Sequence, residues 1–134
     1  MFKTRILWFI SFLTVQLVLT GAISESAYSN GDPTGSSFVE TGEASWYGPG
    51  FHGRKTASGE IFSHEKLTAA CNVLPLGTWV KVTNLKNGKS IIVKTNDRLH
   101  TKTRRIIDLT RAGAKKLDYI HKGLTRVKIE VLDK

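Results

Sequence analysis

Residues 78–97 constrain the fold more than any other stretch, because they carry the pattern of a β-hairpin. In "TWVKVTNL" (78–85), Val80 and Val82 alternate with side chains of other kinds, and "SIIVKTND" (90–97) follows after "KNGK". A period of two is typical of a strand with one buried face, and Asn-Gly favours the tight turn between antiparallel strands. The pattern therefore predicts two paired strands.

Four further runs predict short strands, which brings the total to about six. They have the composition or the alternation of strands: 43–48, 66–71, 104–109 and 124–132. Between the last two, "TRAGAKKLDYIHKG" (110–123) changes to a helical period, with Thr110 as the expected N-cap and Gly123 as the expected end. A strand-rich domain of about ninety residues usually closes into a barrel, because closure removes exposed edges.

The first residues have the composition of an export signal. Lys3 and Arg5 precede the apolar run "ILWFISFLTVQLVL" (6–19), and small residues follow up to Ala22. A membrane anchor is the alternative, but fourteen residues fall short of the roughly 20 needed to span a bilayer. We therefore expect a signal peptide at 1–22.

The segment after the expected signal is rich in Ser, Gly, Asn and Asp and poor in apolar residues. This composition predicts a flexible linker at 23–41, followed by one domain at 42–134. No cysteine lies near the expected cleavage site, so lipoprotein acylation is not predicted. We expect an exported monomer of the periplasm or cell envelope, without stable membrane insertion after cleavage.

The net charge of +9 indicates an anionic partner. For an exported chain such partners are cell-wall polymers and phospholipid surfaces, and the sequence has no Arg/Lys stripe interleaved with aromatic residues that would indicate nucleic acid. Cys71 is the single cysteine, so no internal disulfide can form and the fold depends on its core. The four histidines lack metal-binding spacing, and neither a metal nor an organic cofactor is predicted.

Glu60 and Asp97 are the acidic residues best placed for chemistry, because each lies at the border between a turn-rich segment and a strand. Such carboxylates suit acid and base steps on a bound sugar or amide, and two carboxylates flanking one bond are typical of glycosidic cleavage. Other roles stay open: Asp97 can pair with Arg98 or cap a turn, and Glu60 can be an exposed loop residue. Asp108, just before the expected helix, is interpreted as structural.

The glycine-rich stretch "GPGFHGRKTASGE" (48–60) is expected to be a long loop with polar and aromatic side chains. Aromatic faces beside polar groups are a common way to bind sugar rings. Trp46, at a strand position, is predicted to be partly core. The residues predicted to form a groove around this loop are Tyr47, Phe51, His52 and Arg54.

Four stretches of the sequence resemble the catalytic domain of the RlpA-like lytic transglycosylases. They are, in order, "GEASWYGPGFHGRKTASGEIF", "LTAACNVLPLGTWVKVTNLKNGKSIIVKTNDR", "RIIDLTRAGAKKL" and "GLTRVKIEVL", and they run from Gly42 to Leu132 without a SPOR domain. The resemblance implies a mainly β fold, a six-stranded double-psi β-barrel with one short helix. It also implies cleavage of the β-1,4 bond between N-acetylmuramic acid and N-acetylglucosamine in peptidoglycan, with a 1,6-anhydro product and a preference for peptide-poor glycan strands.

The resemblance implies roles for both carboxylates, since Glu60 matches the Glu of "TASGE" and Asp97 the Asp of "NDR". By similarity to related barrels, Asp97 would donate a proton to the leaving oxygen and then accept one from the muramoyl C6 hydroxyl. Glu60 would position the sugar or stabilise positive charge, and the two roles can be exchanged. The predicted substrate contacts are Tyr47, Phe51, His52, Arg54, Cys71, Asn96 and Arg98.

Cys71 departs from the family pattern, since many relatives have histidine there, eleven residues after the "GE" glutamate. A neutral thiol is a weak hydrogen-bond donor and does not replace an imidazole, so reduced lytic activity is one expected consequence. If the family register holds, Cys71 lies beside the groove and not in the core. The alternative function is a non-catalytic, expansin-like module that binds cell-wall polysaccharide; a secreted toxin or inhibitor has no supporting feature.

Overall fold

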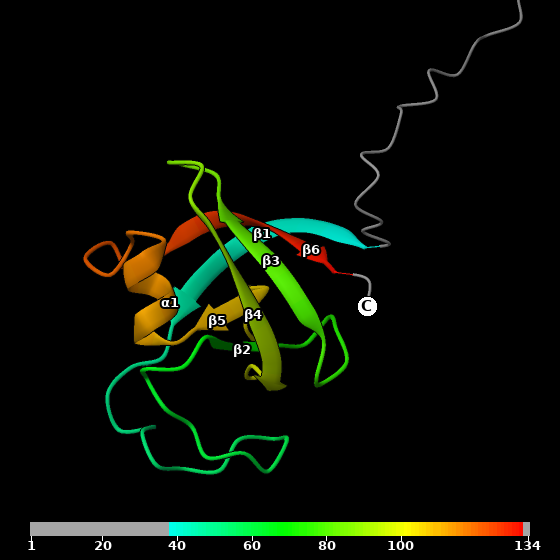
Figure 1. The fold of residues 1–134 in the computed structure, drawn as a ribbon, viewed down its shortest axis with the longest axis vertical. Coiled ribbons are helices and arrows are strands. Elements are labelled where there is room, and N and C mark those ends of the chain that lie inside the picture. The colour runs from blue at the N-terminus through cyan, green and yellow to red at the C-terminus, as the bar shows by residue number, and fades with distance from the viewer. Residues whose placement is uncertain (1–37, 133–134) are drawn as a thin grey trace, which may run out of the picture. The chain divides into compact units, whose positions relative to one another are not determined.

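The computed structural model describes residues 38–132, in which six strands close into a barrel with one short helix (Figure 1). The strands are β1 (Val39–Trp46), β2 (Thr68–Cys71), β3 (Trp79–Asn84), β4 (Ser90–Asp97), β5 (Ile107–Leu109) and β6 (Thr125–Val131), and the helix is α1 (Arg111–Lys116). The expected signal peptide at 1–22 and residues 23–37 of the expected linker lie outside the described residues. Within 38–132, no helix has the length and hydropathy needed to cross a membrane.

The order of strands around the barrel is β1-β5-β2-β4-β3-β6, so each of these strands is paired on both sides. β1 pairs with β5, and β2 with β4, in the parallel direction, while the other four pairs are antiparallel. Closure removes the unpaired edges that would otherwise invite aggregation. The predicted mainly β class, with six strands and one helix, is confirmed.

β3 and β4 form the predicted hairpin. Val80 pairs with Val93 and Val82 with Ile91, and the three valines are fully buried. Gly88 in the connecting turn has a φ of +74°, a left-handed conformation that glycine adopts without a Cβ penalty. The period of two thus turns the valines into the barrel and the alternate side chains of β3 outward.

α1 is shorter than the helix predicted at 110–123. It begins as predicted, because Thr110 Oγ1 accepts a hydrogen bond from Gly113 N at 3.2 Å and so caps the first turn. It ends at Lys116, and Asp118 then adopts the left-handed region, with a φ of 60°. The helical period of the following residues therefore belongs to a turn that leads into β6.

β1 begins at Val39, three residues inside the linker predicted at 23–41. Val39 pairs with Glu130 of β6, so residues 39–41 are strand and not linker. Because the segment before the strand is rich in Ser and Gly, the first residues of the strand were included in the predicted linker. Gly42 is required within it by close packing, since a Cβ there would come within 2.6 Å of Ile106 Cγ2.

Two separate sets of buried side chains support these elements. The barrel core combines residues of all six strands and α1. The loop cluster anchors the long loop between β1 and β2. This loop lies at the end of the barrel where β4 finishes (Figure 1). The loop cluster consists of Tyr47, Phe62, Ala70 and Leu99.

Candidate active site

The turn "TASGE" lies against the end of β4. Ser58 N donates to Asn96 O at 3.0 Å, and Ala57 N donates to Asp97 Oδ1 at 2.9 Å. Because this turn carries Glu60 and β4 ends at Asp97, both predicted catalytic carboxylates lie at the same end of the barrel. The strand order of the barrel thus joins two segments that are far apart in the sequence.

A β-bulge marks the same point. Between Ala69 and Ala70 the pairing of β2 with β4 skips one residue, Asn96. Bulges are common beside active sites, where the extra residue re-aims a side chain. Asn96 is only 3% exposed and its Nδ2 donates to Glu60 Oε2 at 3.2 Å. The predicted substrate contact of Asn96 is therefore corrected to a supporting role beneath Glu60.

Asp97 accepts three hydrogen bonds that fix its orientation. Its Oδ2 accepts from Tyr47 OH at 2.7 Å, and its Oδ1 accepts from Ala57 N and Arg98 N, both at 2.9 Å. The carboxylate thus caps the loop backbone, one of the alternatives that the sequence left open, yet the residue stays partly exposed. A partly exposed carboxyl group with a fixed orientation is suited to proton transfer with a bound ligand.

Tyr47 lies behind Asp97 and not on the groove surface. It is 8% exposed, and its ring packs against Phe62 with the ring centroids 4.3 Å apart. Burial, followed by the hydrogen bond to Asp97, raises the pKa of the Tyr47 hydroxyl above its usual value, so that it remains a donor at neutral pH. The hydroxyl is thus used to hold Asp97, and contact of Tyr47 with substrate stays a prediction.

Glu60 is held in its ionised form. The hydrogen bond from Asn96, opposed by slight burial and assisted by Lys94, lowers the pKa of Glu60 below its usual value. The Lys94 Nζ lies 3.6 Å from Glu60 Oε1. Solvent weakens such an exposed ion pair, but the direction of the shift favours the carboxylate form of Glu60.

Lys94 is a residue of this site that sequence analysis did not identify. It lies on the outward side of β4, where alternation predicts a solvated lysine. The sequence indicated Lys94 only through its position three residues before Asp97. The contact between Lys94 and Glu60 depends on the folded loop.

Phe51, His52 and Arg54 are exposed on the loop. Phe51 packs edge-on against Tyr47 with the ring centroids 5.4 Å apart, and its own centroid lies 5.9 Å from the Arg54 guanidinium carbon. His52 stacks on His64 at 6.1 Å, and its Nδ1 accepts from His64 N at 3.4 Å. These three exposed side chains remain predicted ligand contacts.

Cys71 differs from its predicted position, whereas Arg98 has a structural role and its contact with substrate stays a prediction. The Cys71 side chain belongs to the barrel core and is 0% exposed, and burial raises the pKa of its thiol. Arg98 Nη1 donates to the carbonyl oxygens of Cys71 at 2.5 Å and Leu74 at 2.6 Å. The predicted groove position of Cys71 is therefore corrected to packing, and Arg98 ties the end of β2 to the end of β4.

The remaining candidates lie outside this cluster. Asp108 accepts from Ser45 Oγ at 2.5 Å and pairs with Arg105, which agrees with its structural interpretation. Trp46 is partly buried against the barrel core, as predicted. Among the described residues, no group of three His, Cys, Asp or Glu side chains is arranged to hold a metal ion.

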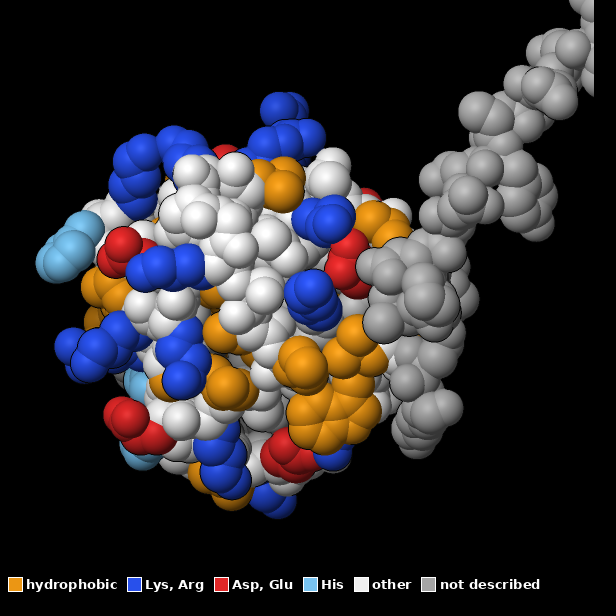
Figure 2. Space-filling view, turned by 45° about the horizontal axis from the view of Figure 1, so that its top comes forward, with side chains coloured by type: hydrophobic (Ala, Val, Ile, Leu, Met, Phe, Trp, Pro, Cys, Tyr) orange, Lys and Arg blue, Asp and Glu red, His pale blue; other side chains and the backbone are white. Residues whose placement is uncertain are grey.

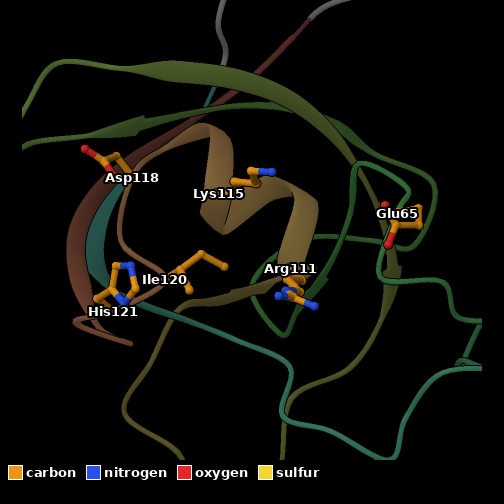
Figure 3. Close-up of a pocket in the computed structure, with 6 residues that line it drawn as sticks. All are labelled: Glu65, Arg111, Lys115, Asp118, Ile120 and His121. Atoms are coloured by element: carbon orange, nitrogen blue, oxygen red, sulfur yellow. The ribbon is translucent and has the colours of Figure 1, made fainter.

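A hollow of about 480 Å³ beside α1 includes neither Glu60 nor Asp97 (Figure 3). Its lining carries both basic and acidic side chains, so its charge selects no single class of ligand. Its lining consists of Glu65, Arg111, Lys115, Asp118, Ile120 and His121.

Residues 39–129 match a family model described as lytic transglycolase. Among the relatives, the endolytic peptidoglycan transglycosylase RlpA of Neisseria meningitidis serogroup A is 52% identical over 93 residues, and that of Pseudomonas aeruginosa 53% identical over 92 residues. Each alignment covers 69% of this chain but only 39% and 27% of the respective relative. The chain thus spans less than half the length of these proteins.

Solved structures of low identity share the barrel. The Streptomyces papain inhibitor superposes with a TM-score of 0.56 at 20% identity, covering 73% of this chain and 97% of the inhibitor. The apo expansin of Clavibacter michiganensis superposes with a TM-score of 0.58 at 19% identity, covering 72% of this chain and 52% of the expansin. At such identity the likeness concerns the fold alone, and it confirms the predicted double-psi β-barrel.

Proposed function

The chain belongs to the lytic transglycolase family, and from this premise we propose that its barrel cleaves the glycan of peptidoglycan as a lytic transglycosylase. The observation that carries the proposal is the pair of carboxylates at the end of β4. Asp97 is oriented by three donors, while Asn96 and Lys94 keep Glu60 ionised. A fixed proton-transfer group beside a fixed negative charge is what glycosidic cleavage requires.

The reaction assigns different tasks to the two carboxyl groups. Asp97, protonated, donates to the leaving oxygen as the bond from muramoyl C1 to that oxygen breaks. The resulting Asp97 carboxylate then takes the proton of the muramoyl C6 hydroxyl, whose oxygen bonds to C1 and closes the 1,6-anhydro ring. Every proton and bond is thereby balanced without consuming water, and Asp97 ends the cycle protonated.

Glu60 stabilises the positive charge that develops on the muramoyl ring. The hydrogen bond from Asn96 and the nearby Lys94 fit this assignment, because both hold Glu60 in place as a negative charge. A carboxylate fixed before the reaction lowers the barrier electrostatically, since no reorganisation is needed as charge appears.

The finer points of the proposal follow from the family resemblance. The substrate is a glycan strand poor in stem peptides, and the place of action is the periplasm or cell envelope, reached by export as a soluble monomer. Exposed basic and aromatic side chains on the loop, such as Arg54 and Phe51, are compatible with an anionic polysaccharide.

A non-catalytic binding module is the second candidate. It is favoured by the exposed aromatic and basic side chains of the loop, Phe51 and Arg54, because such side chains can hold an anionic polysaccharide without any bond being cut. In that function the same loop would hold polysaccharide without cutting it.

Mass spectrometry of the soluble products from digested, peptide-stripped sacculi separates these functions. Wild-type protein is expected to release 1,6-anhydromuramoyl products, and Asp97→Asn is expected to lower the rate by about 10² to 10⁴. Circular dichroism and thermal melting should show that the variant is folded. Ordinary reducing ends would indicate hydrolysis, and binding without any soluble product would establish the binding module.

A further inference from the structure

Trp79 is a large hydrophobic side chain that the barrel does not bury. It occupies the first position of β3, points outward in the alternation, and is 45% exposed, while the neighbouring Val80 is fully buried. A single exposed hydrophobic residue needs no special explanation. The position of Trp79 relative to Glu60 is the feature that points to a role in ligand binding.

The strand register places Trp79 next to the carboxylate site. Trp79 pairs directly with Lys94 across β3 and β4, and directly opposed residues present their side chains on the same face, with Cβ atoms about 5 Å apart. The Lys94 Nζ in turn lies 3.6 Å from Glu60 Oε1. Trp79, Lys94 and Glu60 therefore follow one another across the surface.

Backbone hydrogen bonds fix the position of Trp79 on the barrel. Thr95 N donates to Thr78 O at 2.9 Å, and Leu132 N donates to Trp79 O at 3.0 Å, so the tryptophan is held between β4 and the chain that follows β6. An aromatic ring on a strand is positioned more precisely than one on a loop. Trp79 thus differs from Phe51, whose support is the loop itself.

Further exposed hydrophobic side chains adjoin the same region. Ile92 is 51% exposed and lies diagonally across from Trp79, because it pairs with Lys81, and Ile61, directly after Glu60, is 53% exposed. Figure 2 shows hydrophobic side chains gathered on one part of the face, with basic and acidic side chains around and between them. Apolar surface interrupted by charged donors does not match a continuous apolar interface with another protein.

A pyranose ring matches this surface, because it has an apolar C–H face and a rim of hydroxyl and amide groups. The Trp79 ring can cover the apolar face, while Lys94 lies within reach of the polar rim. Resting on the proposed function, we propose that Trp79 is the platform of a sugar subsite that binds an N-acetylhexosamine ring of the glycan next to the bond that Asp97 and Glu60 cleave.

Steady-state kinetics on purified, peptide-stripped glycan strands test the subsite. Trp79→Ala is expected to raise KM about tenfold with kcat changed less than about twofold, because the platform binds ground state and transition state alike. Trp79→Phe is expected to restore most of the loss. Leu85→Ala is the matched control, since it removes a hydrophobic side chain of similar exposure, 46%, directly after the opposite end of β3, and it should leave KM unchanged. An unchanged KM in Trp79→Ala, a loss confined to kcat, or an equal loss in Leu85→Ala would overturn the proposal.

A binding measurement separates this proposal from the proposed cleavage. In the Asp97→Asn background, sedimentation with the same glycan strands should show weaker binding when Trp79→Ala is added. If wild-type protein releases no product but this dependence on Trp79 is found, the subsite stands and cleavage fails. If wild-type protein cleaves and neither binding nor KM depends on Trp79, the subsite alone fails. Protein that neither cleaves nor binds the glycan contradicts both.

Discussion

The barrel core and the loop cluster are both buried, but they are built on different scales. The barrel core draws on all six strands and α1, and residues such as Ile107 and Val93 are 0% exposed. The loop cluster has four side chains, two of which, Tyr47 at 8% and Leu99 at 6%, still reach solvent. The barrel is thus supported by many redundant contacts, whereas the loop depends on a few.

This difference matters for function because the two carboxylates lie beside the loop cluster, which has fewer buried contacts than the barrel core. The hydrogen bonds that hold Asp97 come from Tyr47 in the loop cluster, from the loop backbone at Ala57 and from the backbone of Arg98, and the one that holds Glu60 comes from β4. Regions with few buried contacts open locally at lower free energy than the core. Damage to the loop cluster should therefore affect activity before it affects the barrel.

The largest expected effect contrasts one residue from each region. Ile107→Ala, in the barrel core, should lower the free energy of unfolding by about 2–5 kcal/mol, because it removes buried methyl groups and leaves a cavity. Phe62→Ala, in the loop cluster, should reduce the global free energy of unfolding less, because the loop can open while the barrel stays folded. Turnover by Phe62→Ala should nevertheless fall at least about tenfold, since Tyr47 loses its packing partner.

Urea denaturation measures the free energy of global unfolding, and hydrogen exchange measures local opening of the loop. Amides of β3 and β4 should exchange faster in Ile107→Ala, whereas amides of residues 53–62 should exchange faster in Phe62→Ala. Equal loss of protection in both regions by either variant would show that loop and barrel form one cooperative unit, which contradicts the comparison.

Tyr47→Phe makes a smaller change within the loop cluster, because it keeps the ring and removes only the hydroxyl that donates to Asp97. A hydrogen bond to a charged group contributes about 1.5–3 kcal/mol, so kcat should fall by about ten- to a hundredfold. KM should change little, since the ring is not on the surface. A raised KM with normal kcat would instead indicate that Tyr47 contacts substrate, as the sequence predicted.

The barrel was largely predictable because several of its elements have short sequence patterns that indicate them. Val80 and Val82 alternate, Gly88 supplies the turn, and Thr110 caps α1, all as the sequence indicated. The first residues of β1 were not predictable, because Val39 is exposed and its neighbours resemble a linker in composition. A strand that gains its stability from pairing and not from burial leaves little trace in hydropathy.

The identities of the two carboxylates were predictable, but their surroundings were not. Asn96 was predicted to contact substrate, but it lies at the bulge in the pairing of β2 with β4 and is only 3% exposed. Cys71 was placed at the groove by its match to a histidine, yet the barrel core encloses its side chain. Both errors concern which way a side chain points near a strand end, where period-two alternation breaks down.

The ionisation of Glu60 gives a smaller, pH-dependent effect. Because its folded pKa is lower than the unfolded value of about 4.3, the stabilisation is present above that pH and is lost as pH falls through the folded pKa. The free energy of unfolding of wild type should exceed that of Glu60→Gln at neutral pH and converge with it on acidification. In an Asn96→Ala background this convergence should flatten, since the main cause of the shift is gone; a difference that grows as pH falls would contradict the assignment.

Cys71→Ala should have the smallest effect, because the thiol belongs to the region that supports the fold and not the site. The variant should keep kcat within about twofold, while losing about 1 kcal/mol of stability for the buried sulfur. In the native protein a thiol reagent should label Cys71 slowly, because the side chain is enclosed and burial raises the thiol pKa, and labelling should become fast in denaturant. Arg98 donates to the backbone carbonyls of Cys71 and Leu74 and not to the thiol, and alanine retains the carbonyl, so the link between β2 and β4 is preserved. Faster cleavage by Cys71→His, or fast labelling of the native thiol, would place Cys71 at the groove. Either result would contradict its assignment to the barrel core.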